Sequence, residues 1–386
     1  MIIMMLLIVF LFLQLTAGLA KAQNIDSILA ARYDYKMISS GRNYPTIDAE
    51  KEDLGSICIL LHEGFSIDQI AGYFKWPAVE MNKKIDLLLK DELLKKNIDG
   101  AYKPNIMVIT LKDNRQYLNV DDKLVDDTVR FLTSRMSQIE TAYKKINGLK
   151  NIDFSDASFF ILSDVMLDNW QIRNVEEKIL KAARTKRNGM NYYYSIQENE
   201  NKKSCEAFGI YGNSYISYGK IMYAMYGNQR ESVNFRTLST EKLCELFKVK
   251  NEKDSNLIRE RLLSEFIKCS QDADHKVSED YKTGFEKLGF IENDKFVAPV
   301  FDQNDVSKLS EMASLFTEEL VELLDKYLND LKKQYHGSAY SNEISFEEFF
   351  IWWYHLYYTK VTDKLIEKNL IKKPGSGIFI YLVNNK

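Results

Sequence analysis

The stretch over residues 53–110 constrains this chain most, because it carries start and stop signals for several helices in close succession. An apolar run at residues 54–61 is long enough for about two helical turns, and Gly64 follows it where helices commonly end. Ser66 then offers an N-cap, with Gln69 at the capping-box position. The pattern predicts two short helices joined by a tight turn.

A third helix and a hairpin are expected to complete this stretch. Pro77 suits the first turn of a helix. The apolar residues after it recur on one helical face, namely Val79, Met81, Ile85, Leu88, Leu89, Leu93 and Leu94. Asp99-Gly100 is a hairpin turn signal, and residues 101–110 form a predicted strand. This order of helix, turn, helix and hairpin resembles the winged helix-turn-helix family, which implies a small α+β domain that in many members binds DNA.

The charge of this stretch bears on whether it binds DNA. Residues 51–103 hold eight Lys, no Arg and nine Asp or Glu, so they offer no net basic footprint. Without Arg, this stretch lacks the side chain that most often recognises guanine through a pair of hydrogen bonds. The composition favours a scaffold used for packing or protein contact. DNA binding through Lys75, Lys83 and Lys84 is the alternative.

Residues 1–22 predict export. Their continuous apolar run ends at Leu13, which is too short for an ordinary membrane span, and Ala20-Lys21-Ala22 forms a small-residue cleavage site before Gln23. We therefore expect a signal peptide and a periplasmic protein, with an uncleaved N-terminal membrane anchor as the alternative. The chain contains no N-x-[ST] sequon, which favours a bacterial envelope over eukaryotic secretion.

Charge, cysteines and motifs exclude several classes of function. The formal net charge of −3 over 386 residues gives no general attraction to nucleic acid or anionic lipid. The four cysteines match no zinc spacing and are too few for a disulfide framework. The chain has no G-x-S-x-G, H-E-x-x-H or P-loop motif. The sequence therefore predicts no cofactor, no metal ligands and no catalytic residue with a recognisable motif.

The rest of the chain predicts an α+β protein that is mostly helical. A long amphipathic helix is expected over residues 119–145. A Tyr-rich region follows, in which the character of the side chains alternates from one residue to the next. This pattern predicts an antiparallel β-meander, with strands at 192–197, 206–211, 215–218 and 221–226. Segments at 281–300 and 343–383 repeat the helix-then-hairpin ending and suggest further winged-helix-like units. The predicted domains are a signal peptide (1–22), a winged-helix-like domain with a lead-in (23–118), helices with the meander (119–237) and a C-terminal helical domain with winged-helix-like hairpins (238–386).

Two further clusters of charged residues are candidate functional sites. Asp164 and Asp168 are four residues apart, so on a helix they share one face and form an acid–base pair, a cation site or a salt-bridge feature. The second cluster comprises the basic residues Arg184, Lys186 and Arg187, which precede three consecutive tyrosines. This cluster is either a site for a nucleic acid or another anion, or cations at a helix C-terminus.

The predicted ligand site combines the Tyr-rich sheet with an aromatic helix at residues 346–358, which Ser345 is expected to cap with Glu348 at the capping-box position. Its members are Tyr194, Tyr218, Trp353 and His355. We interpret the chain as an exported, non-enzymatic binding protein with a protein or glycan partner in the envelope. The alternatives are a DNA-binding transcription regulator and an envelope hydrolase that uses Asp164, Asp168 or His355.

Overall fold

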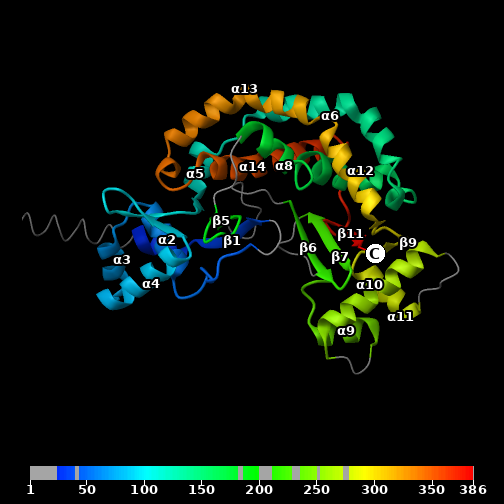
Figure 1. Ribbon diagram of the computed structural model, residues 1–386, viewed down its shortest axis with the longest axis horizontal. Helices are drawn as coiled ribbons and strands as arrows, with labels where there is room; N and C mark the ends of the chain where they lie inside the picture. Colours follow the sequence, from blue (N-terminus) through cyan, green and yellow to red (C-terminus); the bar gives the residue numbers. More distant parts are fainter. Residues whose placement is uncertain are drawn as a thin grey trace, which may run out of the picture. The chain divides into compact units, whose positions relative to one another are not determined.

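The computed structural model describes residues 24–39, 43–180, 186–199, 211–227, 235–249, 253–272 and 278–385 (Figure 1). Within them the protein is a mixed α+β fold that is mostly helical, which confirms the predicted class. The chain divides into two compact units. The first lies within residues 1–119, 182–208 and 328–354, and the second within residues 120–181, 209–327 and 355–386. Each unit is therefore built from segments far apart in the chain, which differs from the three consecutive domains predicted above.

The first unit begins with a helix at residues 24–30 and continues through short helices and strands. Ser66 caps α3 with a complete capping box, since Gln69 N–H bonds to its hydroxyl and the Gln69 side chain accepts from Ser66 N–H. Gly64 has φ +85°, the left-handed conformation that ends α2. The helices of this part are α2 (Leu54–His62), α3 (Ile67–Phe74), α4 (Ala78–Lys90) and α5 (Leu111–Tyr117).

The predicted strand at residues 101–110 is divided in the structure. Its first part, β3 (Tyr102–Pro104), pairs with β2 (Leu94–Lys96) in the expected hairpin, in which Gly100 has φ +84°. Its second part, β4 (Met107–Ile109), joins a different sheet of order β1-β5-β4. There β5 (Tyr192–Asn199) runs antiparallel to β1 (Arg32–Ser39) and parallel to β4. Strand β1 lies in the lead-in, where we predicted no strand.

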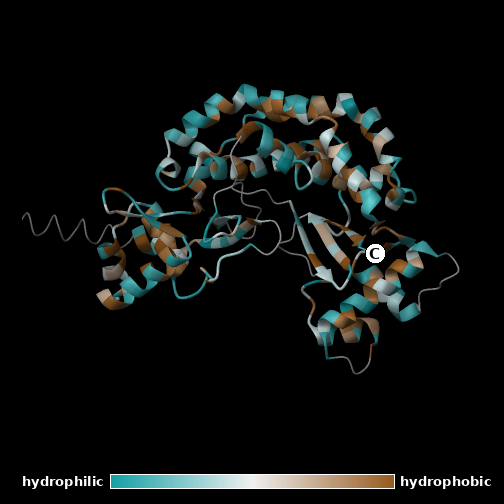
Figure 2. Ribbon diagram, in the orientation of Figure 1, coloured by the Kyte–Doolittle hydropathy of each residue, from teal (hydrophilic) through white to brown (hydrophobic). Residues whose placement is uncertain are grey.

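Helix α2 is the centre of the first core. Eight of its nine residues are buried, and Figure 2 shows it as a largely hydrophobic ribbon. A helix that is apolar on all sides must be enclosed, and here Met81 and Ile85 of α4 and Tyr194 and Ile196 of β5 belong to the same cluster. Each such large apolar side chain stabilises the fold by about 1.5–3 kcal/mol relative to exposure. The core thereby holds His62, the last residue of α2, in a buried position.

The second unit is mainly helical. Its first long helix, predicted for residues 119–145, is α6 (Asp122–Tyr143). The other helical elements are η1 (Asn147–Leu149), α7 (Phe154–Phe159), η2 (Phe160–Val165), α8 (Ile172–Val175), η3 (Glu176–Leu180), α9 (Thr240–Phe247), α10 (Ser255–Gln271), α11 (Glu279–Lys287) and α12 (Gln303–Ser314). Both α13 (Thr317–His336) and α14 (Phe346–Glu367) contribute residues to each unit, whereas η4 (Ala339–Asn342) belongs to the first.

A four-stranded sheet of order β10-β11-β7-β6 lies in the second unit. Its strands are β6 (Gly212–Tyr218), β7 (Ile221–Gly227), β10 (Val300–Phe301) and β11 (Ile378–Asn384). Only β6 and β7 belong to the predicted Tyr-rich meander, because β5 pairs in the other sheet. The prediction of one continuous meander was therefore wrong, since alternation along a strand does not specify its partner. The predicted strand at residues 206–211 lies almost entirely outside the described residues.

The two predicted repeats of the helix-then-hairpin ending have different outcomes. The first is present, since α11 is followed by a hairpin of β8 (Ile291–Glu292) and β9 (Lys295–Phe296). The second is not, because β11 pairs with β7 and β10 instead of forming a local hairpin. Among the described helices, none combines the length and the apolar character needed to cross a membrane.

Candidate functional site

In the described part of the first unit, a compact group of ionisable side chains surrounds His62. Its Nδ1 lies 2.7 Å from Glu343 Oε2, and its Nε2 lies 3.0 Å from Asp113 Oδ2. The His62 and Glu343 side chains are almost fully buried, at 2% and 1% exposed. The imidazole is thus bracketed by two carboxylates, one at each nitrogen.

Local structure fixes each partner of His62. Thr110 is the N-cap of α5: its hydroxyl accepts from Asp113 N–H at 3.1 Å and also donates to the Asp113 carboxylate. Tyr340 of η4 stacks on the imidazole with ring centroids 5.4 Å apart, and its hydroxyl donates to the Val108 carbonyl at 2.8 Å. These contacts orient both the acid and the ring before any ligand is considered.

The electrostatics of this cluster favour a charged imidazole. Burial alone would lower the pKa of His62, but the Glu343 and Asp113 carboxylates outweigh it and raise that pKa to about 10. Burial would likewise raise the pKa of Asp113, yet the hydrogen bonds from His62 and Thr110 bring it below its ordinary value. Without a further ligand, His62 is therefore an imidazolium paired with carboxylates at neutral pH.

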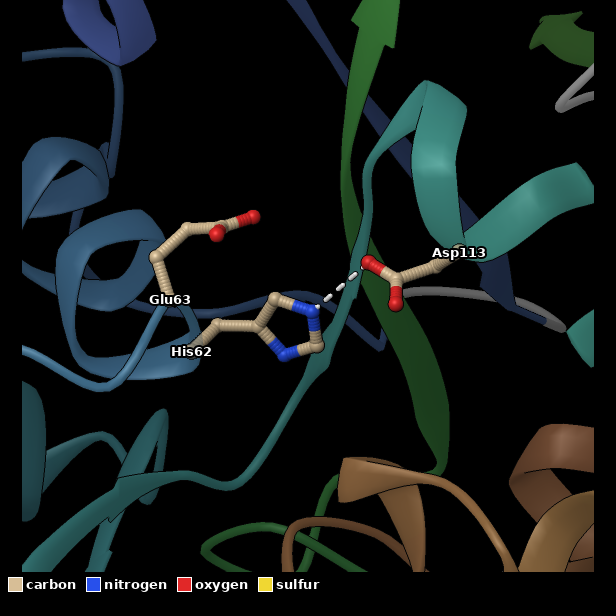
Figure 3. A group of neighbouring side chains, drawn as sticks. All are labelled: His62, Glu63 and Asp113. Atoms are coloured by element: carbon tan, nitrogen blue, oxygen red, sulfur yellow. Dashed lines mark hydrogen bonds and ion pairs between the residues drawn. The ribbon is translucent and has the colours of Figure 1, made fainter. Parts of the chain in front are cut away.

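Glu63 adds a third carboxylate beside the pair. One potential ligand atom from each of His62, Glu63 and Asp113 lies within 4.8 Å of the others. Figure 3 shows Glu63 and His62 extending from the end of α2 and Asp113 approaching from α5. Burial raises the pKa of Glu63, and the charges of Asp113 and Glu198 add to this. The residues present therefore form one nitrogen and two oxygen ligands of the kind that hold a divalent transition metal.

A second buried cluster lies in the second unit and contains the predicted carboxylate pair. Asp164 belongs to η2 and is fully buried, and Asp168 is 4% exposed. Asp164 Oδ2 accepts from Asn213 Nδ2 at 2.8 Å, whereas His355 Nε2 is 3.9 Å from Asp168 Oδ1. Within the described residues, Asp164 Oδ1 and Asp168 Oδ2 lack a well-formed hydrogen bond.

Burial raises the pKa values of both carboxyl groups in this pair. The pKa of Asp168 rises to about 8 through burial, and that of Asp164 rises well above its ordinary value through burial and the charge of Asp168. Hydroxyl groups dominate the surroundings, including a contact of Ser163 with Tyr226 and a Ser163–Thr362 hydrogen bond of 2.6 Å. The pair therefore holds a proton at neutral pH, and it lies in an apolar and hydroxyl-rich interior.

The four residues of the predicted ligand site are divided between the units. Tyr194 and Trp353 belong to the first unit, and Tyr218 and His355 to the second. Tyr194, Tyr218 and Trp353 are at most 8% exposed, and the His355 side chain is 14% exposed. Tyr194 packs in the α2 core, and Tyr218 packs in the cluster with Phe235. Their burial is what a packing role requires, and the ligand role stays a prediction.

The six residues predicted to bind nucleic acid or another anion also differ in position. Lys84 is 7% exposed, and its Nζ donates to the Glu52 carbonyl at 2.6 Å. Arg187 is 1% exposed and donates to Glu348 Oε2 at 2.5 Å. These two side chains form buried contacts within the protein and are not available to bind phosphate. The other four comprise the exposed Lys75, Lys83 and Lys186, and Arg184, which lies outside the described residues.

Glu348 also differs from its expected role. Ser345 accepts from Glu348 N–H at 3.2 Å, as predicted for the cap of α14. The Glu348 carboxylate, however, receives Arg187 and Tyr194 N–H instead of closing a capping box. A buried guanidinium needs a charged partner more than a helix end needs a second cap, so the ion pair prevails.

Sequence reasoning missed the His62 cluster, because His62 belongs to no motif and its partners are distant in the chain. Asp113 lies 51 residues away and Glu343 lies 281 residues away. The only local signal was the pair His62-Glu63 at the end of an apolar helix. The amino-acid sequence matches no protein-family model and no curated protein, and no solved structure matches the chain.

Proposed function

We propose that the protein is an exported, non-enzymatic interaction protein of the bacterial cell envelope, and that α2, α3, α4 and the β2–β3 hairpin form a winged-helix-like module that contacts a protein partner. The export part rests on residues 1–22, as argued from the sequence. The partner part rests on the exposed face of α4, the helix that corresponds to the recognition helix in the resemblance.

The exposed face of α4 carries the proposal. A shallow groove runs along it, lined by Val79, Asn82, Lys83, Asp86, Leu87 and Lys90. Val79 is 82% exposed, and Ile98 at the hairpin tip is also fully exposed. Apolar side chains mixed with charges of both signs are typical of protein contacts, whereas a phosphate backbone demands a basic surface.

The positions of the basic residues favour a protein partner over DNA. Lys84 and Arg187 are engaged in the core, so the exposed basic residues that the structure describes on α4, on its flank and in the β2–β3 hairpin are Lys75, Lys83, Lys90 and Lys96. Asp86 lies on the same exposed face as Lys83. A regulator that neutralised several phosphates would need more cations than this face supplies.

A crosslinking experiment tests the partner. A photoreactive amino acid at Val79 is expected to give discrete adducts with a protein in cells that make the mature chain. The matched control is Leu257 of α10, an exposed apolar helical residue in the second unit that should give none. Equal adducts at both positions, or none at Val79, would contradict the proposal.

Two further measurements separate the alternatives. Mass spectrometry of the native protein should find a mature N-terminus at Gln23, and an intact Met1 would contradict export. Purified mature protein should give only weak, salt-sensitive complexes with duplex DNA. A sub-micromolar, sequence-selective complex at physiological salt would support the regulator instead.

A further inference from the structure

We propose that His62 Nε2, Glu63 and Asp113 bind a divalent transition metal ion of the zinc class, with Glu343 orienting the imidazole through Nδ1. This inference is independent of the proposed function, because it concerns a cluster at the far end of α2 from its N-cap and not the exposed face of α4. It rests on the arrangement of four side chains within the first unit.

The donor set fits this class of ion. One imidazole nitrogen with two carboxylate oxygens is a common ligand set for zinc and similar ions, whereas calcium prefers six to eight oxygens. Three protein ligands leave a fourth tetrahedral position for water or for another ligand. The set therefore excludes calcium as the preferred occupant.

The geometry needs little change to enclose an ion. Tetrahedral zinc with bonds of about 2.0–2.2 Å places its ligand atoms roughly 3.5 Å apart. His62 Nε2 and Asp113 Oδ2 are already 3.0 Å apart, and the three ligand atoms lie within 4.8 Å of one another. Only Glu63 has to approach. Its side chain is partly exposed, and no hydrogen bond to the described residues holds it away from the other two ligands.

Glu343 supplies the independent observation that points to a ligand. A metal-binding histidine almost always donates its second ring N–H to a carboxylate, a carbonyl or water, which fixes the ring orientation. Glu343 Oε2 lies 2.7 Å from His62 Nδ1, and within the described part of the chain its other oxygen has no hydrogen-bond partner although the side chain is 1% exposed. A buried, half-satisfied carboxylate costs stability and calls for an explanation, and the orientation of a metal-binding imidazole supplies one.

Charge balance supports the same conclusion. The carboxylates of Glu63, Asp113 and Glu343 lie around one imidazole ring. On binding, the metal ion takes the position of any Nε2 proton, and that proton leaves to water. A dication then lies at the place where the carboxylates converge.

Zinc binding by purified mature protein tests the proposal, measured by calorimetry and by the visible spectrum of Co²⁺ as a substitute. The wild type is expected to bind one Zn²⁺ much more tightly than Ca²⁺. Glu63→Gln should weaken Zn²⁺ binding by about tenfold or more, because it removes a ligand charge. Its metal-free stability should be unchanged or slightly higher, because Glu63 makes no hydrogen bond that the variant would lose.

Two controls keep the result interpretable. Glu80→Gln changes an exposed glutamate in the first turn of α4 and should leave Zn²⁺ affinity unchanged. His336→Gln removes an exposed histidine of the same unit and should also have no effect. If the wild type binds no Zn²⁺, or if Glu63→Gln binds it as tightly as Glu80→Gln does, the metal site is refuted.

Discussion

His62 in the first unit and Asp168 in the second are both buried ionisable side chains, but charged partners outweigh the effect of burial only at His62. His62 has a carboxylate at each ring nitrogen, so its charge is compensated where it is buried. Asp168 follows Asp164 by four residues, just beyond the helical turn that ends at Leu167, and burial raises the pKa values of both carboxyl groups. The first cluster therefore keeps its charge, and the second keeps a proton. Burial raises the pKa of Asp168 and would lower that of His62, and only His62 has oppositely charged partners that outweigh burial.

The largest expected effect comes from removing the cation of the first cluster. His62→Leu leaves Glu343 and Asp113 as buried or nearly buried carboxylates without the imidazolium between them, which should cost about 3–5 kcal/mol of unfolding free energy. Hydrogen exchange of the α2 amides measures the loss within the first unit. Adding Glu343→Gln should recover part of it, because one uncompensated charge is removed. If the single variant loses under 1 kcal/mol, the ion cluster is not fully buried in solution.

The second cluster should lose stability as the pH rises, in contrast to a carboxylate whose pKa is lowered by an ion pair. The pKa of Asp168 is about 8 in the folded protein and 3.8 as its unperturbed value, so the folded state holds a proton that the unfolded state releases. Its stabilising contribution is complete below about pH 4 and is lost as the pH rises through about 8. Asp168→Asn should therefore gain on the order of 2 kcal/mol relative to wild type between these limits.

The contrast with the first cluster makes this pH test selective. The folded pKa of His62 is about 10 against an unperturbed 6.5, so its contribution is complete below about pH 6.5 and disappears as the pH rises through about 10. Hydrogen exchange of the β7 amides should report the loss of stability in the lower pH range, which belongs to Asp168. Exchange of the α2 amides should report the loss in the upper pH range, which belongs to His62. A flat difference between Asp168→Asn and wild type across both windows would mean that Asp168 is ionised when folded.

The smallest expected effects come from hydroxyl groups at the edge of each cluster. Tyr340→Phe leaves the Val108 carbonyl without its partner and should cost about 1–2 kcal/mol. Tyr226→Phe should cost at most about 1 kcal/mol, because Ser163 keeps Thr362 as a partner. Chemical denaturation of the two variants measures the difference. A larger loss for Tyr226→Phe would show that its hydroxyl also stabilises the carboxyl pair.

Local features of the fold were predictable from the sequence. The capping box of Ser66 and Gln69 and the Asp99-Gly100 turn depend on residues within a few positions of one another. The interior position of Lys84 could also have been found, because it shares a helical face with Met81, Ile85 and Leu88. Its aliphatic stem and its bond to Glu52 explain why a lysine is tolerated there.

The candidate site was not predictable, because its geometry depends on long-range pairing. The strand predicted at residues 192–197 is β5 (Tyr192–Asn199), yet its partner β1 lies about 160 residues earlier in the chain. Glu343 belongs to no recognisable pattern until η4 brings it to His62. Alternating patterns indicate which face of a strand or helix is buried, and capping residues indicate where a helix ends. Neither indicates which strands or helices contact one another.

The separation between His62 and Glu343 has a consequence for how the protein is made. The two residues are 281 positions apart, and the first unit takes its last segment from residues 328–354. At roughly 5–20 residues per second, a ribosome needs about 15–60 s to add the second residue after the first. During that interval the nascent N-terminal helices are present without the acid that completes their histidine. Early fragments of this chain are therefore expected to depend on chaperones or proteases for their fate until translation passes residue 354.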